Sequence, residues 1–195
     1  MIYFVRHGNK AVGDYYDADR NICDDPLSER GLEDAQRIAV YFHDIDIKKI
    51  YVSEYVRAQQ TAAPTAQDKG LPVIVDARVN ELNGGMFHRL SEEECKASHP
   101  QLWDMYVNHL GDFQFPGGES GADAKRRQDS FLYDMEKETE DILVVSHDAY
   151  IRILMCNLLG LPVHMRYRFV TEMGGVSTIA FDGKEWRILR FNQIV

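Results

Sequence analysis

The segment Tyr3-Phe4-Val5-Arg6-His7-Gly8 lies near the start of the chain, and Leu143-Val144-Val145-Ser146-His147-Asp148 lies near its end. Each is a short apolar run that stops abruptly at a histidine. Such runs are typical of strands in a buried parallel sheet. The residue just past a strand of an open α/β sheet lies where these sheets bind ligands. The two segments therefore predict that His7 and His147 share one ligand-binding edge, and the paired imidazoles suggest a site for a phosphoryl group.

Strand and helix patterns alternate along the rest of the chain. Periodic apolar residues predict a helix after Ser28, its expected N-cap, and another after Ser53, which carries Pro64 and ends near Gly70. Further strands are expected at 49–52, 73–75, 142–145, 177–181 and 186–191, and further helices at 122–139 and 149–159. This alternation favours an α/β fold, a three-layer sandwich in which helices flank a mostly parallel central sheet.

The segment 81–118 is less periodic and contains Gly84-Gly85 and Pro116-Gly117-Gly118. We expect it to leave the edge of the sheet and cover the substrate. The chain of 195 residues shows no repeat, low-complexity tract or linker. A single domain over residues 1–195 is therefore predicted.

Composition narrows the class of partner. The net charge of −9 argues against nucleic acid. No stretch is as long and apolar as a membrane span, and the N-terminus does not resemble a secretory signal. We therefore expect a cytoplasmic protein with neither a nucleic-acid nor a membrane partner. Cys23, Cys95 and Cys156 are widely spaced and form no CxxC pair, so we expect reduced thiols and no metal site.

Phosphoryl chemistry suits the residues around the two histidines. An imidazole such as His7 becomes a nucleophile when one ring nitrogen is unprotonated and the other is held by an acceptor. Arg6 and Arg57 can each bind phosphate oxygens with two parallel hydrogen bonds. His147 precedes a predicted helix, whose positive end favours an anion. Glu81 is the candidate proton donor, because a carboxyl group beside a half-buried cleft can have a raised pKa.

A set of motifs stands in a definite order along almost the whole chain. They are Arg6-His7-Gly8, Pro26-Leu27-Ser28-Glu29-Arg30-Gly31, residues 53–62, Glu81, Pro116-Gly117-Gly118-Glu119-Ser120 and Ser146-His147. In this order they resemble the histidine phosphatase superfamily, the phosphatase branch of the phosphoglycerate mutase-like proteins.

The resemblance implies a phosphoglycerate mutase-like fold and a role for each residue of the pocket. His7 would become a phosphohistidine, while Arg6, Arg57 and His147 would bind the phosphoryl group. Glu81 would donate a proton to the leaving group and later act as the base for water. The family needs no metal and no other cofactor.

Departures from the family pattern concern the substrate side. Asn9 and Lys10 follow the first motif, Gly13 stands where the family often has Asn, and Asp148 replaces a Gly after the second histidine. Asn9 is expected either to bind phosphate or to satisfy a turn. Asp148 beside His147 is expected to repel a phosphate dianion.

A second group of candidates concerns the part of the substrate beyond the phosphoryl group. Lys10, His88 and Arg89 add positive charge near the pocket and favour a substrate with a second anionic group. Glu119 and Ser120 either contact the ligand or cap the helix that follows.

These observations predict a metal-independent phosphomonoesterase that acts on a small phosphorylated metabolite through a phosphohistidine. A mutase of the same family would return the phosphoryl group to its substrate, but mutases tend to carry extra segments that exclude water, and this chain is short. A non-catalytic module that binds a phosphorylated metabolite or protein is the other alternative. Exposed strand edges also make a homodimer conceivable.

Overall fold

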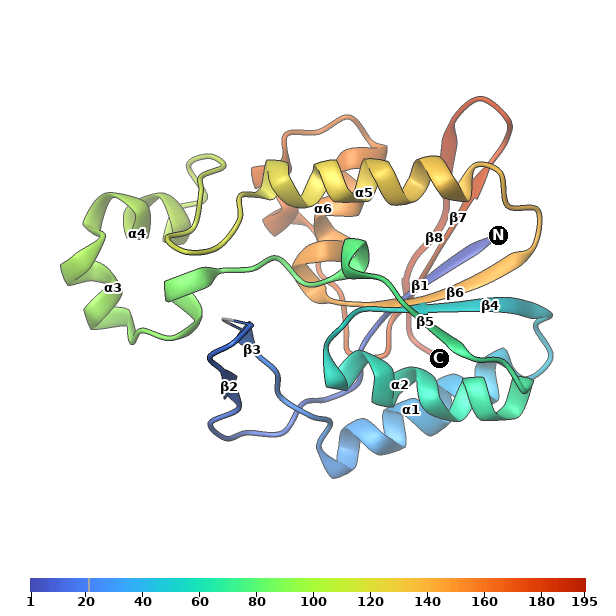
Figure 1. Cartoon of the computed structure of the whole chain (residues 1–195). Helices are drawn as coiled ribbons and strands as arrows, with labels where there is room; N and C mark the ends of the chain where they lie inside the picture. The colour runs from blue at the N-terminus through green and yellow to red at the C-terminus, as the bar shows by residue number, and fades with distance from the viewer. Residues whose placement is uncertain (21) are drawn as a thin grey trace.

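A six-stranded sheet with the order β5-β4-β6-β1-β7-β8 forms the centre of the protein (Figure 1). The computed structural model describes residues 1–20 and 22–195. Four neighbouring strands are parallel to one another: β1 (Ile2–Arg6), β4 (Ile47–Val52), β5 (Val73–Val75) and β6 (Asp141–Ser146). Next to β1, β7 (Val176–Phe181) runs antiparallel to it, and the edge strand β8 (Trp186–Gln193) runs antiparallel to β7. A small separate sheet pairs β2 (Tyr16–Asp17) with β3 (Ile22–Cys23).

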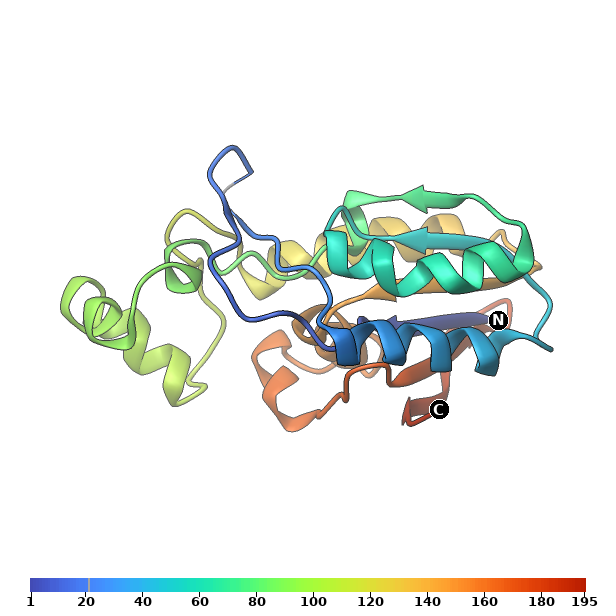
Figure 2. The ribbon, with the colours of Figure 1, turned by 90° about the horizontal axis from the view of Figure 1, so that it is seen from below.

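Helices cover both faces of the large sheet (Figures 1 and 2). One face carries α1 (Glu29–Phe42) and α2 (Val56–Lys69), and the other carries α5 (Gly121–Met135) and α6 (Asp148–Leu158). Short 3-10 helices, η1 (Ala77–Val79) and η3 (Val163–Arg168), lie in the connections after β5 and α6. The predicted three-layer α/β sandwich is confirmed.

The alternation of side chains along β1 explains the three layers. Ile2 and Phe4 pack with Phe131 of α5 in one buried cluster, while Tyr3 and Val5 belong to a second cluster with residues of α1 and α2. Successive side chains of a strand point to opposite faces, so an apolar run without polar interruptions requires cover on both sides. The first strand is therefore buried in the middle of the sheet.

The register between β1 and β6 fixes the position of the two histidines. Arg6 pairs with Ser146, and the backbone N–H of His7 donates to the Ser146 carbonyl at 3.0 Å. Because the two strands are parallel, both chains leave the sheet at the same edge. His7 and His147 follow directly, as the sequence predicts.

Two helices differ from their expected bounds. The helix after Ser53 starts only at Val56, because the Ser53 side chain bonds to His147 instead of capping the helix. The helix expected to reach residue 139 ends at Met135, and the carboxylate of Glu138 beyond it pairs with Lys49 of β4 at 2.7 Å.

Residues 81–118 extend past the end of the sandwich (Figures 1 and 2). They contain η2 (Gly85–His88), α3 (Glu92–Ser98) and α4 (Pro100–Val107). The ring of Phe87 lies between 5.5 and 6.3 Å from the rings of Trp103, Tyr106, Phe113 and Phe115. All of these rings except that of Trp103 belong to a cluster that also contains Ala124 of α5 and Ile153 of α6, so the segment is anchored to the sandwich. Its role as a cover for substrate stays a prediction.

Several expectations about partners are not tested by the fold. Cys23, Cys95 and Cys156 are free. Over residues 1–20 and 22–195, no helix has the length and apolar character needed to cross a membrane. The homodimer, the cytoplasmic location and the absence of a nucleic-acid partner stay predictions.

Gly31→Ala tests the close approach of α1 to the loop after His7. An added Cβ at residue 31 would lie 1.9 Å from the carbonyl oxygen of Asn9, so the backbone must shift. We expect a loss of about 1–3 kcal/mol in the free energy of unfolding, measured by urea denaturation, although alanine favours helices. In the control Gly111→Ala, the new Cβ would meet only the Cε of Met105, at 3.6 Å. Equal stability of the two variants would contradict the steric argument.

Candidate active site

A cavity of about 570 Å³ opens at the edge of the sheet where β1 and β6 end. This volume is typical of sites for small molecules. Of the sequence-predicted residues, the cavity is lined by Arg6, His7, Lys10, Arg57, Glu81 and His88. Among the residues that the structure describes, no group of three or more His, Cys, Asp or Glu side chains is arranged to hold a metal ion.

His7 is buried, and its tautomer follows from its contacts. Its Nδ1 lies 2.7 Å from the carbonyl oxygen of Gly8, which can only accept, so Nδ1 carries the proton. Burial, followed by the charge of Arg57, lowers the pKa of His7 to about 3. The ring is therefore neutral at ordinary pH, and Nε2 is unprotonated. This is the state that a nucleophilic imidazole requires.

Arg57 faces this unprotonated nitrogen. Its Nε donates to His7 Nε2 at 3.2 Å, and its Nη1 donates to the carbonyl of Cys23 at 3.2 Å. Asp25 lies 3.9 Å away, and the guanidinium stacks on the ring of Tyr55 at 4.4 Å. Arg57 is thus fixed by three groups beside the nucleophile, where it can bind a phosphoryl oxygen.

His147 lies beside His7, with 5.0 Å between the ring centroids. Its Nε2 is 2.7 Å from Ser53 Oγ, and that oxygen already accepts the N–H of Tyr55. The Ser53 hydroxyl is best satisfied by donating to Nε2, which places the proton of His147 on Nδ1. Within the described part of the chain this buried Nδ1 has no partner. Burial and the charge of Arg57 lower the pKa of His147 far below its usual value, so the ring is a neutral donor.

Arg6 supplies a second buried donor, because its Nε has no partner among the described residues. Its Nη1 donates to the carbonyl of Thr171 at 2.6 Å. Asp148 lies 3.7 Å from Arg6, and it also pairs with Arg152 at 2.7 Å and accepts from the hydroxyl of Thr171. The charge of Asp148 is therefore shared by two arginines, which removes the expected repulsion toward a phosphate dianion.

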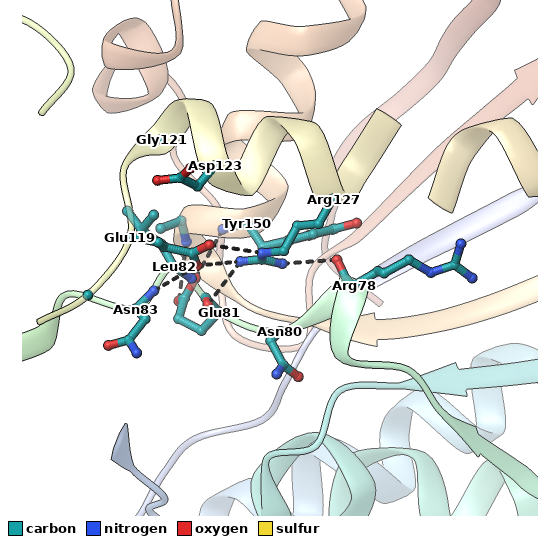
Figure 3. Close-up of polar contacts among 12 residues, drawn as sticks. Arg78, Asn80, Glu81, Leu82, Asn83, Glu119, Gly121, Asp123, Arg127 and Tyr150 are labelled. Carbon is teal, nitrogen blue, oxygen red and sulfur yellow. Dashed lines mark hydrogen bonds and ion pairs between the residues drawn. The ribbon is translucent and has the colours of Figure 1, made fainter. Parts of the chain in front are cut away.

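Glu81 sits at the N-terminus of α6 and lines the cavity (Figure 3). Its carboxyl group accepts the backbone N–H groups of Leu82 at 2.8 Å, Tyr150 at 3.0 Å and Ala149 at 3.3 Å. Burial raises the pKa of Glu81 more than these hydrogen bonds lower it, which suits a proton donor. The positive end of α6 thus holds this side chain directly, rather than facing a ligand as the sequence suggested.

Arg127 of α5 fixes the backbone around Glu81 (Figure 3). It donates to the carbonyl of Glu81 at 3.0 Å and to that of Arg78 at 2.9 Å, and it pairs with Glu119 at 2.8 Å. Sequence reasoning missed Arg127, because nothing in its local pattern shows that α5 lies over this segment.

Glu119 and Ser120 have structural roles, and the alternative that they contact the ligand stays a prediction. Glu119 is engaged by Arg127 and by the backbone of Asn83. Ser120 is the N-cap of α5 and forms a capping box with Asp123. Neither residue lines the cavity.

Asn9 and Arg89 also lie outside the cavity lining. The side-chain oxygen of Asn9 accepts from the hydroxyl of Ser28 at 2.7 Å, so the residue fixes a turn. Arg89 is exposed and stacks on the ring of Tyr16 at 4.2 Å. The structure does not bring Asn9 or Arg89 to the cavity, and their expected roles in binding phosphate and substrate stay predictions.

Lys10 and His88 do reach the cavity. Lys10 is paired with Asp25 at 2.9 Å, so its charge is largely neutralised. The cavity residues that were not anticipated include Arg152 of α6, with Arg166 and Tyr167 of η3. The only local signal for Arg166 and Tyr167 is the basic run around η3.

The buried neutral state of His7 predicts loss of stability in acid. The unfolded chain binds a proton at His7 near pH 6.5, whereas the folded protein binds it only near pH 3. The free energy of unfolding therefore falls as the pH drops between these values. From pH 7 to pH 5 the contribution of His7 is about 2 kcal/mol. Urea denaturation of wild type and His7→Asn at both pH values measures it, and an unchanged pH dependence in the variant would contradict the buried neutral ring.

Comparison with known proteins places this geometry in a family. Residues 2–194 match the histidine phosphatase superfamily (branch 1). The chain is 30% identical to "Phosphoserine phosphatase 1" of Hydrogenobacter thermophilus, over 98% of this chain and 91% of that protein. It is 32% identical to "Probable phosphoglycerate mutase GpmB" of Cronobacter sakazakii, over 95% and 87%.

Solved structures share the fold. Bacillus stearothermophilus YhfR superposes with a TM-score of 0.84 at 24% identity, covering 100% of this chain and 97% of that one. The alpha-ribazole phosphatase from Shigella flexneri gives a TM-score of 0.82 at 23% identity, covering 98% and 96%. From the match over residues 2–194, the chain belongs to the histidine phosphatase superfamily.

Proposed function

We propose that this chain is a phosphomonoesterase that hydrolyses a small phosphorylated metabolite through a phosphohistidine at His7. One observation carries the proposal. The Gly8 carbonyl holds the proton of His7 on Nδ1, and the opposite nitrogen, Nε2, faces Arg57 beside His147. The phosphatase-named relative supports hydrolysis of a phosphate ester.

Binding begins with donors that the protein leaves unpaired. Arg6 Nε and His147 Nδ1 are buried and lack partners among the described residues. Phosphoryl oxygens would accept from both, and from Arg57, so the substrate satisfies groups that are costly to bury alone. These fixed donors also stabilise the charge on the non-bridging oxygens in the transition state. We propose that they supply it without a metal.

The first chemical step transfers the phosphoryl group. A bond forms between His7 Nε2 and phosphorus as the bond from phosphorus to the ester oxygen breaks. Glu81 gives its proton to that oxygen, so a neutral alcohol leaves. The Nδ1–H bond to the Gly8 carbonyl stabilises the positive charge that develops on the ring.

The second step restores the enzyme. Glu81, now a carboxylate, takes a proton from water as the water oxygen attacks phosphorus. The bond from phosphorus to Nε2 breaks, and its electron pair returns to the ring. Inorganic phosphate leaves from the donors that bound the ester.

Mutase activity is the alternative that a specific observation favours, because relatives named as mutases cover most of the chain. A mutase would release an isomerised phosphoester instead of phosphate. A non-catalytic binding module would retain the ester and form no phosphohistidine.

His7→Ala removes the nucleophile, and we expect phosphate release to fall by at least about a thousandfold. Release from a panel of phosphomonoesters is measured in the presence of a chelator. His43→Ala, at an exposed histidine after α1, is the matched control and should retain the wild-type rate. Turnover retained in His7→Ala would refute the mechanism, and isomerised product without phosphate would identify a mutase.

The variant Glu81→Gln tests whether Glu81 protonates the leaving group. For an alkyl phosphate, kcat/KM should fall by about a hundredfold or more, because an alkoxide is a poor leaving group without a proton. For p-nitrophenyl phosphate the loss should be much smaller, since the phenolate leaves unprotonated. Glu94→Gln, on the exposed face of α3, is the control. Equal losses on the two substrates would show that Glu81 is not the acid.

A further inference from the structure

Arg166 is a buried cation that the catalytic centre does not use. Its side chain is only 2% exposed, yet it lines the same cavity. Its hydrogen bonds go to the carbonyl of Val163 at 3.3 Å and to the hydroxyl of Tyr167 at 3.1 Å. A guanidinium has five N–H donors, and a buried charge is costly without an anionic partner. The two neutral partners leave it incompletely satisfied.

The nearest carboxylate does not satisfy the remaining donors of Arg166. Asp112 Oδ1 lies 3.6 Å from Arg166 Nη1, which is beyond hydrogen-bond length. Both oxygens of Asp112 already accept backbone N–H groups at the start of α5, from Gly121 at 2.9 Å and Ala122 at 2.8 Å. The oxygens of Asp112 are therefore already hydrogen-bonded to the start of α5, and the guanidinium of Arg166 can still bind another anion.

A second guanidinium lies next to the first. Arg152 Nε donates to the backbone carbonyl of Arg166 at 3.2 Å. The ring of Tyr167 is 4.6 Å from the Arg166 guanidinium and 5.4 Å from that of Arg152. Two cations and one hydroxyl thus meet at a single stretch of the cavity wall.

This stretch lies close to the phosphoryl position. Arg152 is four residues after Asp148, and Asp148 directly follows His147. Four residues of α-helix rise about 6 Å. A group that begins on the leaving alcohol can therefore reach Arg152 and Arg166 while the phosphoryl group remains beside His147.

The charges of the cavity indicate what kind of group fits. The basic side chains in the lining are Arg6, Lys10, Arg57, Arg152 and Arg166. Asp25 and Asp148 oppose them, and Glu81 is uncharged in its acid form. Asp112, 3.6 Å from Arg166 but outside the lining, is a third negative charge. Five positive charges against three negative ones leave a surplus of two, which a phosphate dianion balances, so a second group with a single charge fits better than a second dianion.

We propose that Arg166, together with Arg152 and Tyr167, binds a carboxylate on the leaving alcohol. The substrates would then be phosphate esters of short hydroxy or amino acids. A carboxylate adds only one negative charge, and it matches the planar fork of an arginine. This inference rests on the proposed function. The second anion site then lies at Arg166. It does not lie at Lys10, which pairs with Asp25, or at Arg89, which lies outside the cavity.

Matched pairs of esters test the proposal in the wild-type protein. O-phosphoserine is compared with phosphoethanolamine, and 3-phosphoglycerate with glycerol 3-phosphate, since the members of each pair differ in the carboxylate. The measured quantity is the ratio of kcat/KM within each pair. We expect the acid to be favoured by about tenfold to a hundredfold, as for one charge-assisted hydrogen-bonded pair. A ratio near one in both pairs would overturn the proposal without any variant.

The variant Arg166→Gln tests whether Arg166 causes the preference for the acid. The ratio within each pair should fall toward one, through a higher KM for the acid. Arg166→Lys keeps the charge and should restore part of the ratio. Arg168→Gln, at an exposed arginine on the same η3, should leave it at the wild-type value. An unchanged ratio in folded Arg166→Gln would contradict the assignment. A bisphosphate preferred over the acids would contradict the carboxylate.

Failure of the subsite and failure of the proposed function give different results. Hydrolysis of p-nitrophenyl phosphate by the wild type, lost in His7→Ala, reports the function alone. If this activity is present and the acid is not favoured, only the subsite is wrong. If no ester is hydrolysed, the proposed function itself is wrong.

Discussion

β1 and β6 run parallel in the middle of the sheet, and their register pairs Arg6 with Ser146. The chemistry at this edge depends on that pairing. It brings His7 and His147 to 5.0 Å from each other although they are 140 residues apart in the sequence. The strands are apolar on both faces, so helices bury them on both sides and the register cannot slip without exposing core residues.

Burial gives the two histidines their chemical state. Both rings are buried and arginines lie around them, so the pKa values of both are lowered and each imidazole stays neutral. One ring is an acceptor at its free nitrogen and the other is a donor, because Gly8 and Ser53 hold their second nitrogens in opposite ways. A protein with a net charge of −9 thus concentrates positive charge in one cavity.

The strand-end motifs allowed the fold, His7, Arg57 and Glu81 to be predicted, because hydrophobic runs and short motifs are local in sequence. The contacts that complete the site are not local. Nothing near Ser53 shows that its hydroxyl faces His147 rather than capping a helix. Arg166 carries no motif, and only the packing of η3 on α6 brings it to the cavity. Glu119 illustrates the opposite case, in which a residue in a recognised motif serves the packing of α5.

The decisive measurement identifies the atom that carries the phosphoryl group, because it tests whether His7 Nε2 is the nucleophile. The enzyme is mixed with a turned-over ester, quenched in alkali within milliseconds, and digested, and the phosphohistidine isomer is assigned by NMR coupling between phosphorus and the ring protons. Because the Gly8 carbonyl holds the proton on Nδ1, we expect phosphate on Nε2 of His7. Phosphate on Nδ1, or on any other residue, would contradict it.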